Sequence, residues 1–131
     1  MNHEKILIID DSHSVRMAVG ATLSGAGFDV LEASDGEEGR ARIRETGDLA
    51  LVICDVNMPR MDGLSMLELV KAEPRFADLP ILMLTAEGEP DLVRRARDHG
   101  ARGWIVKPVQ EVLLLHTVRR LIRASGERAA K

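Results

Sequence analysis

The sequence predicts an α/β protein in which a parallel β-sheet lies between two layers of helices. Short apolar runs alternate with segments of helical periodicity along the 131 residues, which is typical of successive βα units. The apolar run at residues 49–54 ends at Asp55, as expected for a strand that is buried on both faces. Five such units predict a three-layer, doubly wound domain with right-handed crossovers. Periodicity leaves the strand order open.

Composition indicates one ordinary globular domain, expected at residues 1–124 with a short frayed tail at residues 125–131. Hydrophobic residues make up 45% of the chain, and the net charge of -3 gives no electrostatic reason to expect nucleic-acid binding. The single cysteine, Cys54, excludes an internal disulfide and lies in an apolar run, which favours a buried side chain. We expect no membrane span and no signal peptide, and therefore a cytoplasmic protein.

Strands are predicted where short apolar runs are bounded by turn residues. The predicted strands are residues 5–10, 28–33, 49–55, 81–85 and 103–106. Pro80 introduces the fourth strand, and Lys107 with Pro108 follows the fifth.

The first two helices have recognisable ends. The first, at residues 13–26, has an apolar stripe and a candidate N-cap at Ser12. The second is predicted to begin with a capping box between Ser34 and Glu37 and to end before Gly47.

Three further helices follow. The third is predicted at residues 64–73, and the fourth begins near Pro90 and ends near Gly100. The fifth has a core-facing stripe made of Leu114, Val118, Leu121 and Ile122. Val112 and Leu115 fall off this stripe, and Leu115 is a candidate for a partner or dimer surface.

Polar residues collect at the carboxyl ends of the predicted strands. They are Asp10, Asp11, Asp55, Thr85 and Lys107. These ends meet at one edge of a parallel sheet, where open α/β sheets bind ligands. Clustered carboxylates raise the pKa of at least one member, and Mg²⁺ would relieve the repulsion. Helix capping would explain an isolated Asp pair but not the whole set.

The same edge combines a cation, a hydroxyl and a carboxylate nucleophile. Pro108 favours an extended backbone at Lys107, which directs the ammonium towards the acidic residues, where a salt bridge to Asp55 is also expected. Thr85 adds a hydroxyl donor. The set suits phosphoryl transfer, and aspartate can form an aspartyl-phosphate.

The motifs DD, DVNMPRMDG, T and KP, each after a predicted strand, resemble the receiver domain of two-component response regulators. The likeness is strongest to the stand-alone CheY-like chemotaxis type and extends from the first strand to Pro108. It implies a flavodoxin-like sheet of order 2-1-3-4-5. It also implies that Asp55 accepts a phosphoryl group from a histidine kinase, and that the chain is no enzyme beyond its own phosphorylation and dephosphorylation.

The resemblance assigns roles to individual residues. Ligands for Mg²⁺ (or Mn²⁺) would be Asp10, largely through water, Asp11, Asp55 and the backbone carbonyl of Asn57. Lys107 and Thr85 would hold the phosphoryl oxygens. Thr85 and Trp104 would form the switch, with Trp104 in the place of a more usual Tyr or Phe. Val109 replaces the Phe often found after KP.

The resemblance also implies how long the phosphorylated state lasts and which partners it binds. Asn57 and Glu87 would tune dephosphorylation to a scale of seconds to minutes. Phosphorylation would alter binding of a target protein, with the flagellar motor switch as a candidate, through the face made by the fourth helix, fifth strand and fifth helix. We expect a monomer or weak dimer that binds neither nucleic acid nor membrane.

Three alternatives remain open from the residues. The receiver could be a phosphorelay intermediate or serve a pathway other than chemotaxis. A haloacid-dehalogenase-like phosphatase would need a second Asp two residues after Asp55, where Asn57 stands. A flavin carrier of the same topology would need a phosphate loop that Asp10 and Asp11 would repel.

Overall fold

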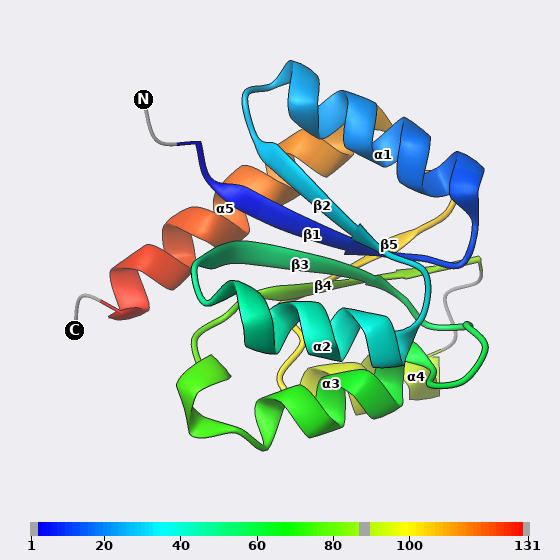
Figure 1. The fold of residues 1–131 in the computed structure, drawn as a ribbon, viewed down its shortest axis with the longest axis vertical. Coiled ribbons are helices and arrows are strands. Elements are labelled where there is room, and N and C mark those ends of the chain that lie inside the picture. Colours follow the sequence, from blue (N-terminus) through cyan, green and yellow to red (C-terminus); the bar gives the residue numbers. More distant parts are fainter. Residues whose placement is uncertain (1–2, 87–89, 130–131) are drawn as a thin grey trace.

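The computed structural model describes residues 3–86 and 90–129, and over these residues the chain forms one parallel sheet between two helical layers (Figure 1). The sheet has five strands in the order β2-β1-β3-β4-β5. Its strands are β1 (Lys5–Ile9), β2 (Asp29–Ala33), β3 (Leu49–Asp55), β4 (Ile81–Thr85) and β5 (Gly103–Val106). The predicted fold class and strand order are confirmed.

The helices cover both faces of the sheet. They are α1 (His13–Gly25), α2 (Gly36–Thr46), α3 (Gly63–Lys71), α4 (Pro90–Asp98) and α5 (Glu111–Ala129), with a short 3₁₀ turn η1 (Pro74–Phe76) after α3. α1 and α5 lie on one face, and α2, α3 and α4 lie on the other (Figure 1). Among the described residues, every helix is too short or too polar to cross a bilayer.

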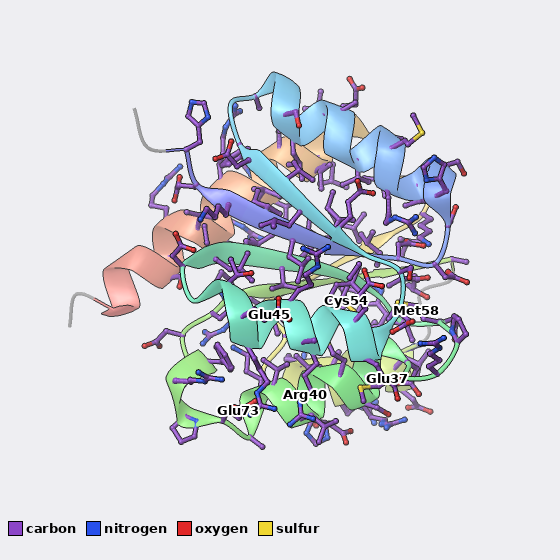
Figure 2. All side chains as sticks on the ribbon, in the orientation of Figure 1. Glu37, Arg40, Glu45, Cys54, Met58 and Glu73 are labelled. Atoms are coloured by element: carbon purple, nitrogen blue, oxygen red, sulfur yellow. The ribbon has the colours of Figure 1, made fainter. Side chains whose placement is uncertain are left out.

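β3 is the central strand of the sheet. The core has two halves, one on each face of the sheet. Along β1, Ile6 and Ile8 face the α1 and α5 layer, whereas Leu7 and Ile9 face the opposite layer. This alternation follows from the two-residue period of a strand. Cys54, labelled in Figure 2, is fully buried as predicted, and burial together with the charge of Asp55 raises the pKa of its thiol far above the ordinary range. It therefore acts as a small apolar side chain.

Charged groups link α2 to the segment between α3 and η1 (Figure 2). Glu73, just before η1, lies 4.0 Å from Arg40 and 3.7 Å from Arg44, which both belong to α2. These ion pairs are partly exposed, so each stabilises the fold only slightly.

The start of α2 differs from the prediction by one residue. Asp35, not Ser34, is the N-cap, and its carboxylate accepts from the Glu38 amide at 2.9 Å. The Ser34 hydroxyl instead donates to the Glu38 carboxylate at 3.2 Å. The predicted capping box was wrong because Asp35 has an extended backbone, with φ of -156° and ψ of 175°, so that α2 begins only at Gly36.

α5 also differs from the prediction. Leu115 is half-buried and packs against the core, so it is not the exposed residue that the sequence suggested. Val112 is 83% exposed and Leu113 is 48% exposed. The buried side of α5 is wider than a single stripe because the helix contacts both α1 and the sheet. The helix also continues to Ala129, through most of the segment that was expected to fray.

Candidate functional site

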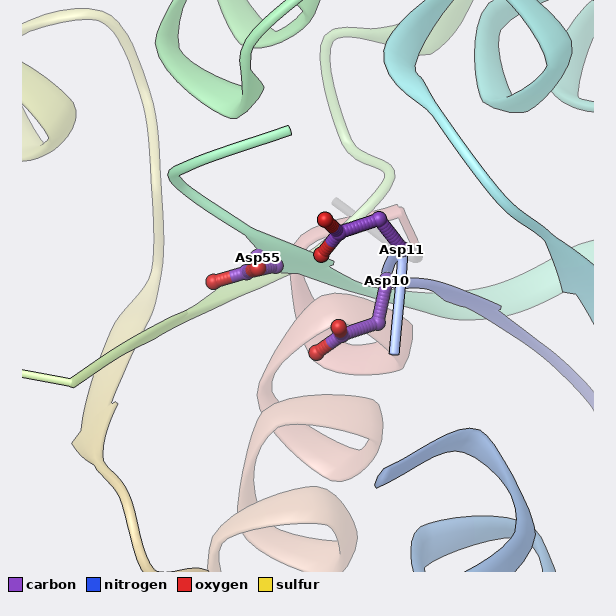
Figure 3. Close-up of side chains that lie close together, drawn as sticks. All are labelled: Asp10, Asp11 and Asp55. Atoms are coloured by element: carbon purple, nitrogen blue, oxygen red, sulfur yellow. The ribbon is translucent and has the colours of Figure 1, made fainter. Parts of the chain in front are cut away.

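Three aspartates meet at the carboxyl edge of the sheet (Figure 3). One carboxylate oxygen from each of Asp10, Asp11 and Asp55 lies within 4.8 Å of the other two. Asp10 is 0% exposed and Asp55 is 5% exposed, whereas Asp11 is exposed. Among the described residues, no other group of three acidic, histidine or cysteine side chains comes as close together.

The turn after β1 fixes the position of Asp10. Its amide donates to the carbonyl of Ala33 at the end of β2, at 3.1 Å. Its carboxylate accepts from the amide of Ser12 at 2.9 Å, and Ser12 in turn caps α1 through the Val15 amide. Arg16 donates to the Asp10 carbonyl. Asp10 is thus held from both sides through its backbone, which keeps its buried carboxylate at the edge.

The loop after β3 carries Asn57 and folds back closely on Asp55. The Gly63 amide donates to the carbonyl of Val56 at 2.8 Å. A Cβ atom at Gly63 would lie 2.1 Å from the Asp55 carbonyl oxygen, so only glycine allows this approach. Asn57 is exposed in this loop, two residues after Asp55.

Lys107 supplies the positive charge of the site. Its ammonium lies 3.0 Å from Asp10 Oδ2 and 3.4 Å from Asp55 Oδ1. The salt bridge to Asp55 was predicted, and the shorter contact to Asp10 was not. Burial disfavours the charged ammonium, but the hydrogen bond and attraction to Asp10, followed by those to Asp55, outweigh it and raise the pKa of Lys107. The residue therefore stays protonated.

The pKa of Asp55 is raised, as predicted for a member of a carboxylate cluster. The largest cause is burial, followed by the negative charge of Asp10. The Lys107 ammonium lowers the pKa of Asp55, but by less than burial and Asp10 raise it. The charge of Asp11 also raises this pKa. One ammonium therefore leaves the three carboxylates with unrelieved repulsion.

This donor set fits a divalent cation. Hard carboxylate oxygens within 4.8 Å of one another are the ligands that Mg²⁺ and Mn²⁺ prefer, and the site carries excess negative charge. A dication would relieve the repulsion that Lys107 leaves.

Of the remaining predicted residues, Thr85 lies at this edge and Trp104 lies further back along β5. Thr85 is buried at the end of β4, and its carbonyl accepts from the Lys107 amide at 2.7 Å. Trp104 lies on β5 opposite Met83 and packs, partly buried, against the core beneath α2, α3 and α4. Its indole Nε1 is buried and has no hydrogen-bond acceptor among the described residues. Glu87 lies outside the described residues.

Besides the contact of Lys107 with Asp10, sequence reasoning missed a backbone contact next to this site. The Gly36 amide, in the turn before α2, donates to the Met61 carbonyl at 3.1 Å and so reaches the loop that carries Asn57. The Asp-Gly pair at residues 35–36 was the available signal, because such pairs mark turns with unusual backbone demands.

Comparison with known proteins agrees with this geometry. The chain matches the family model of the response regulator receiver domain over residues 6–119. It therefore belongs to the response regulator receiver family.

Within that family, similar proteins include CheY-like chemotaxis proteins. The chain is 41% identical to the chemotaxis protein CheY1 of Helicobacter pylori (strain J99), over 79% of this chain and 85% of that protein. It is 37% identical to the chemotaxis protein CheY homolog of Campylobacter jejuni (strain 81-176), over 97% of this chain and 99% of the homolog.

Solved structures give the same result. The chemotaxis response regulator CheY4 of Vibrio cholerae is similar with a TM-score of 0.85 and 38% identity, over 92% of this chain and 99% of that one. A CheY-like receiver domain protein of Methanospirillum hungatei has a TM-score of 0.88 at 25% identity, over 97% and 99% of the two chains. The resemblance inferred from the motifs is confirmed, and the chain is a phosphoacceptor-type response regulator.

Proposed function

We propose that this chain acts as a chemotaxis response regulator that accepts a phosphoryl group on Asp55 from a histidine kinase. The observation that carries the proposal is a buried Asp55 carboxylate that shares the Lys107 ammonium with Asp10, at a ligand-binding edge of the sheet. The chemotaxis role is supported by the names of the relatives, one of which is matched over 99% of its length.

The transfer would be a direct displacement at phosphorus. An Asp55 carboxylate oxygen attacks the phosphorus of a phosphohistidine, the P–N bond breaks, and the imidazole nitrogen leaves with the electron pair. The product is an acyl phosphate on Asp55. The Lys107 ammonium and the Thr85 hydroxyl would hold the phosphoryl oxygens and neutralise their charge, which is the main contribution a protein makes to such reactions.

Asp10, Asp11, Asp55 and the Asn57 backbone carbonyl would hold Mg²⁺, or Mn²⁺ in its place. The ion, when bound, supplies further neutralisation of phosphoryl charge. The excess negative charge of the site supports this assignment.

The signal would be a shift between two packings of the α4, β5 and α5 face. Thr85 would move towards the phosphoryl oxygens and Trp104 would fill the space it leaves. Val106 on β5 and Leu113 on α5 expose apolar surface on this face, which suits a protein partner. The partner would be a phosphorylation-dependent target, with the flagellar motor switch as the first candidate.

The proposed state is a cytoplasmic monomer or weak dimer that turns over no substrate beyond its own phosphoryl group. Asn57 and Glu87 would flank the path of the attacking water, and we expect the acyl phosphate to last seconds to minutes. A phosphoprotein that survives overnight at neutral pH with Mg²⁺ would contradict this part of the proposal.

The test is incubation with Mg²⁺ and a small acyl-phosphate donor such as acetyl phosphate. We expect stoichiometric labelling that is acid-stable and base-labile, requires the metal and is absent from Asp55→Asn. Asp62→Asn is the matched control, because Asp62 is an exposed helix cap in the same loop and asparagine caps equally well. Multiple turnover of a phosphomonoester without a labelled protein would instead support the phosphatase alternative.

Pathway and partner need a second experiment. Phosphorylated protein and Asp55→Asn should be compared for binding to purified flagellar-motor and kinase components. Phosphorylation-dependent binding to the motor component is expected. Phosphoryl transfer onward to a histidine protein, without motor binding, would favour the phosphorelay alternative.

A further inference from the structure

The turn between β2 and α2 contacts both sides of the acidic site. At its start, the carbonyl of Ala33 accepts from the Asp10 amide at 3.1 Å. At its end, the amide of Gly36 donates to the Met61 carbonyl at 3.1 Å. Asp10 belongs to the acidic cluster, and Met61 belongs to the loop that follows Asp55. Four consecutive residues, 33–36, therefore connect the two segments that would hold the metal.

Gly36 is placed so that no other residue fits without displacing this loop. A Cβ atom at residue 36 would lie 2.4 Å from the Met61 carbonyl oxygen and 2.9 Å from Met61 Cβ. The first of these atoms is backbone, so the clash cannot be relieved by rotating a side chain. The glycine allows a close approach between two backbone segments.

The neighbouring residue adds a second link. Asp35 Oδ2 lies 3.9 Å from Arg60 Nε, while the Asp35 carboxylate also caps α2. Arg60 has a φ of 66°, an unfavourable region for a residue with a Cβ atom. Arg60 therefore has a backbone conformation that it does not favour, and the β2–α2 turn contacts the loop at Arg60 and at the next residue, Met61.

Another contact of the loop lies at its base. The Gly63 amide bonds to the carbonyl of Val56, which closes the loop next to Asp55. Asn57 lies between this closure and the lateral bond to Gly36. The bond between Gly63 and Val56 sets where the loop starts and ends. The bond between Gly36 and Met61 sets the distance of the loop from β1 and the Asp10 backbone.

We propose that Gly36 is a positioning residue for the divalent-cation site, acting through Met61 on the loop that carries Asn57. The inference rests on the proposed function, because it assigns Gly36 a role in the metal site proposed there. Groups outside the metal ligands that orient them commonly change metal affinity by about 10–100-fold when they are altered. The β2–α2 turn would then set the spacing between the aspartates of β1 and the carbonyl of Asn57.

The test compares two glycine substitutions in α2. Gly36→Ala should weaken Mn²⁺ binding, measured from the electron paramagnetic resonance signal of the free ion, by about tenfold or more. Mg²⁺ binding, measured by calorimetry, should weaken in parallel. Gly39→Ala is the matched control, because its Cβ atom would also lie 2.4 Å from a neighbour, Ile9 Cδ1, but the atoms that it would meet all belong to the Ile9 side chain and none to backbone. It should leave both affinities unchanged.

Urea unfolding without metal separates positioning from stability. Gly39→Ala can lower the free energy of unfolding by repacking the core. If metal affinity merely followed the stability of the fold, both variants would therefore lose affinity. Loss of affinity in Gly36→Ala alone supports the proposal. Wild-type affinity in a folded Gly36→Ala protein overturns it.

A measurement on the unsubstituted protein covers the case in which Gly36→Ala does not fold. Coupling between sites is reciprocal, so Mg²⁺ should slow hydrogen exchange at the Gly36 amide. An exchange rate at Gly36 that Mg²⁺ leaves unchanged overturns the proposal. Failure of the unsubstituted protein both to bind metal and to be labelled by acetyl phosphate would overturn the proposed function itself.

Discussion

Replacing Asp55 by asparagine is expected to stabilise the metal-free protein while it abolishes phosphorylation. Asp55 is 5% exposed, and one of its oxygens lies within 4.8 Å of an oxygen of Asp10. At an effective dielectric constant of about 20, like charges at this separation repel by roughly 3 kcal/mol. Asn has nearly the shape of Asp and carries no charge, so it removes this repulsion.

The attraction between Lys107 and Asp55 opposes this stabilisation, so the sizes of the two interactions must be compared. Its ammonium is 3.4 Å from Asp55 Oδ1, an attraction of about 5 kcal/mol at the same dielectric constant. This attraction roughly cancels the repulsion from Asp10 and the screened repulsion from exposed Asp11. The cost of burying the carboxylate, several kcal/mol for a buried ion, then sets the sign. We expect the free energy of unfolding of Asp55→Asn to exceed that of the wild type by about 1–3 kcal/mol near neutral pH.

The difference should depend on pH. Burial, followed by the charge of Asp10, raises the pKa of Asp55 in the folded state above its unfolded value of about 3.9. The folded protein therefore binds this proton more tightly than the unfolded chain does. In acid below the unfolded pKa both states are protonated and the variants should be equally stable. The advantage of Asp55→Asn should grow as pH rises through the folded-state pKa.

Urea unfolding in the presence of EDTA, repeated across pH, measures these differences. Lys107→Met is the informative counterpart, because it leaves the carboxylates of Asp10 and Asp55 without their cation. Removing one partner of a buried ion pair typically destabilises by about 3–5 kcal/mol, so the two substitutions should act in opposite directions. An Asp55→Asn protein that is less stable than the wild type near neutral pH, or a difference independent of pH, would refute the reasoning.

Three further predictions concern the scaffold. Lys71→Met should lower the free energy of unfolding by about 2–3 kcal/mol, because the Lys71 ammonium donates to the carbonyls of Phe76, Ala77 and Leu79. Lys5→Met, which removes only an exposed pair with Asp48, should change it by less than about 1 kcal/mol in the same urea titration. Leu115→Asp should destabilise the fold, whereas Leu113→Asp should leave the free energy of unfolding nearly unchanged. Leu113→Asp should weaken binding to the phosphorylation-dependent partner in a pull-down. Equal stability of the two variants would contradict the difference in burial between Leu115 and Leu113. Gly63→Ala should lower thermal stability and metal affinity together, since its Cβ atom would lie 2.1 Å from the Asp55 carbonyl oxygen, and a wild-type melting temperature would count against that contact.

Local patterns in the chain determined the fold class and most of the site. The apolar runs are long enough and uniform enough to mark buried strands, and β3, β4 and β5 begin and end at the predicted residues. Parallel strands bring their carboxyl ends to one edge, so Asp10, Asp11, Asp55, Thr85 and Lys107 could be grouped before their distances were known. The family resemblance then supplied the strand order that periodicity leaves open.

Tertiary contacts decided what local patterns could not. The N-cap of α2 is Asp35 and not Ser34, and the Gly36 amide that follows it bonds to Met61, which lies 25 positions along the chain. Leu115 is half-buried because α5 packs on both α1 and the sheet, so helical periodicity alone underestimated the width of the buried side of α5.

The acidic edge shows the same division. Residue type and spacing along the sequence determined which charges meet there, because the pattern of βα units dictates where strands end. Only the folded structure decided that the Lys107 ammonium lies nearer to Asp10 than to Asp55. Which carboxylate a cation approaches depends on side-chain directions and burial across three strands, and these are set by packing between segments far apart in the chain.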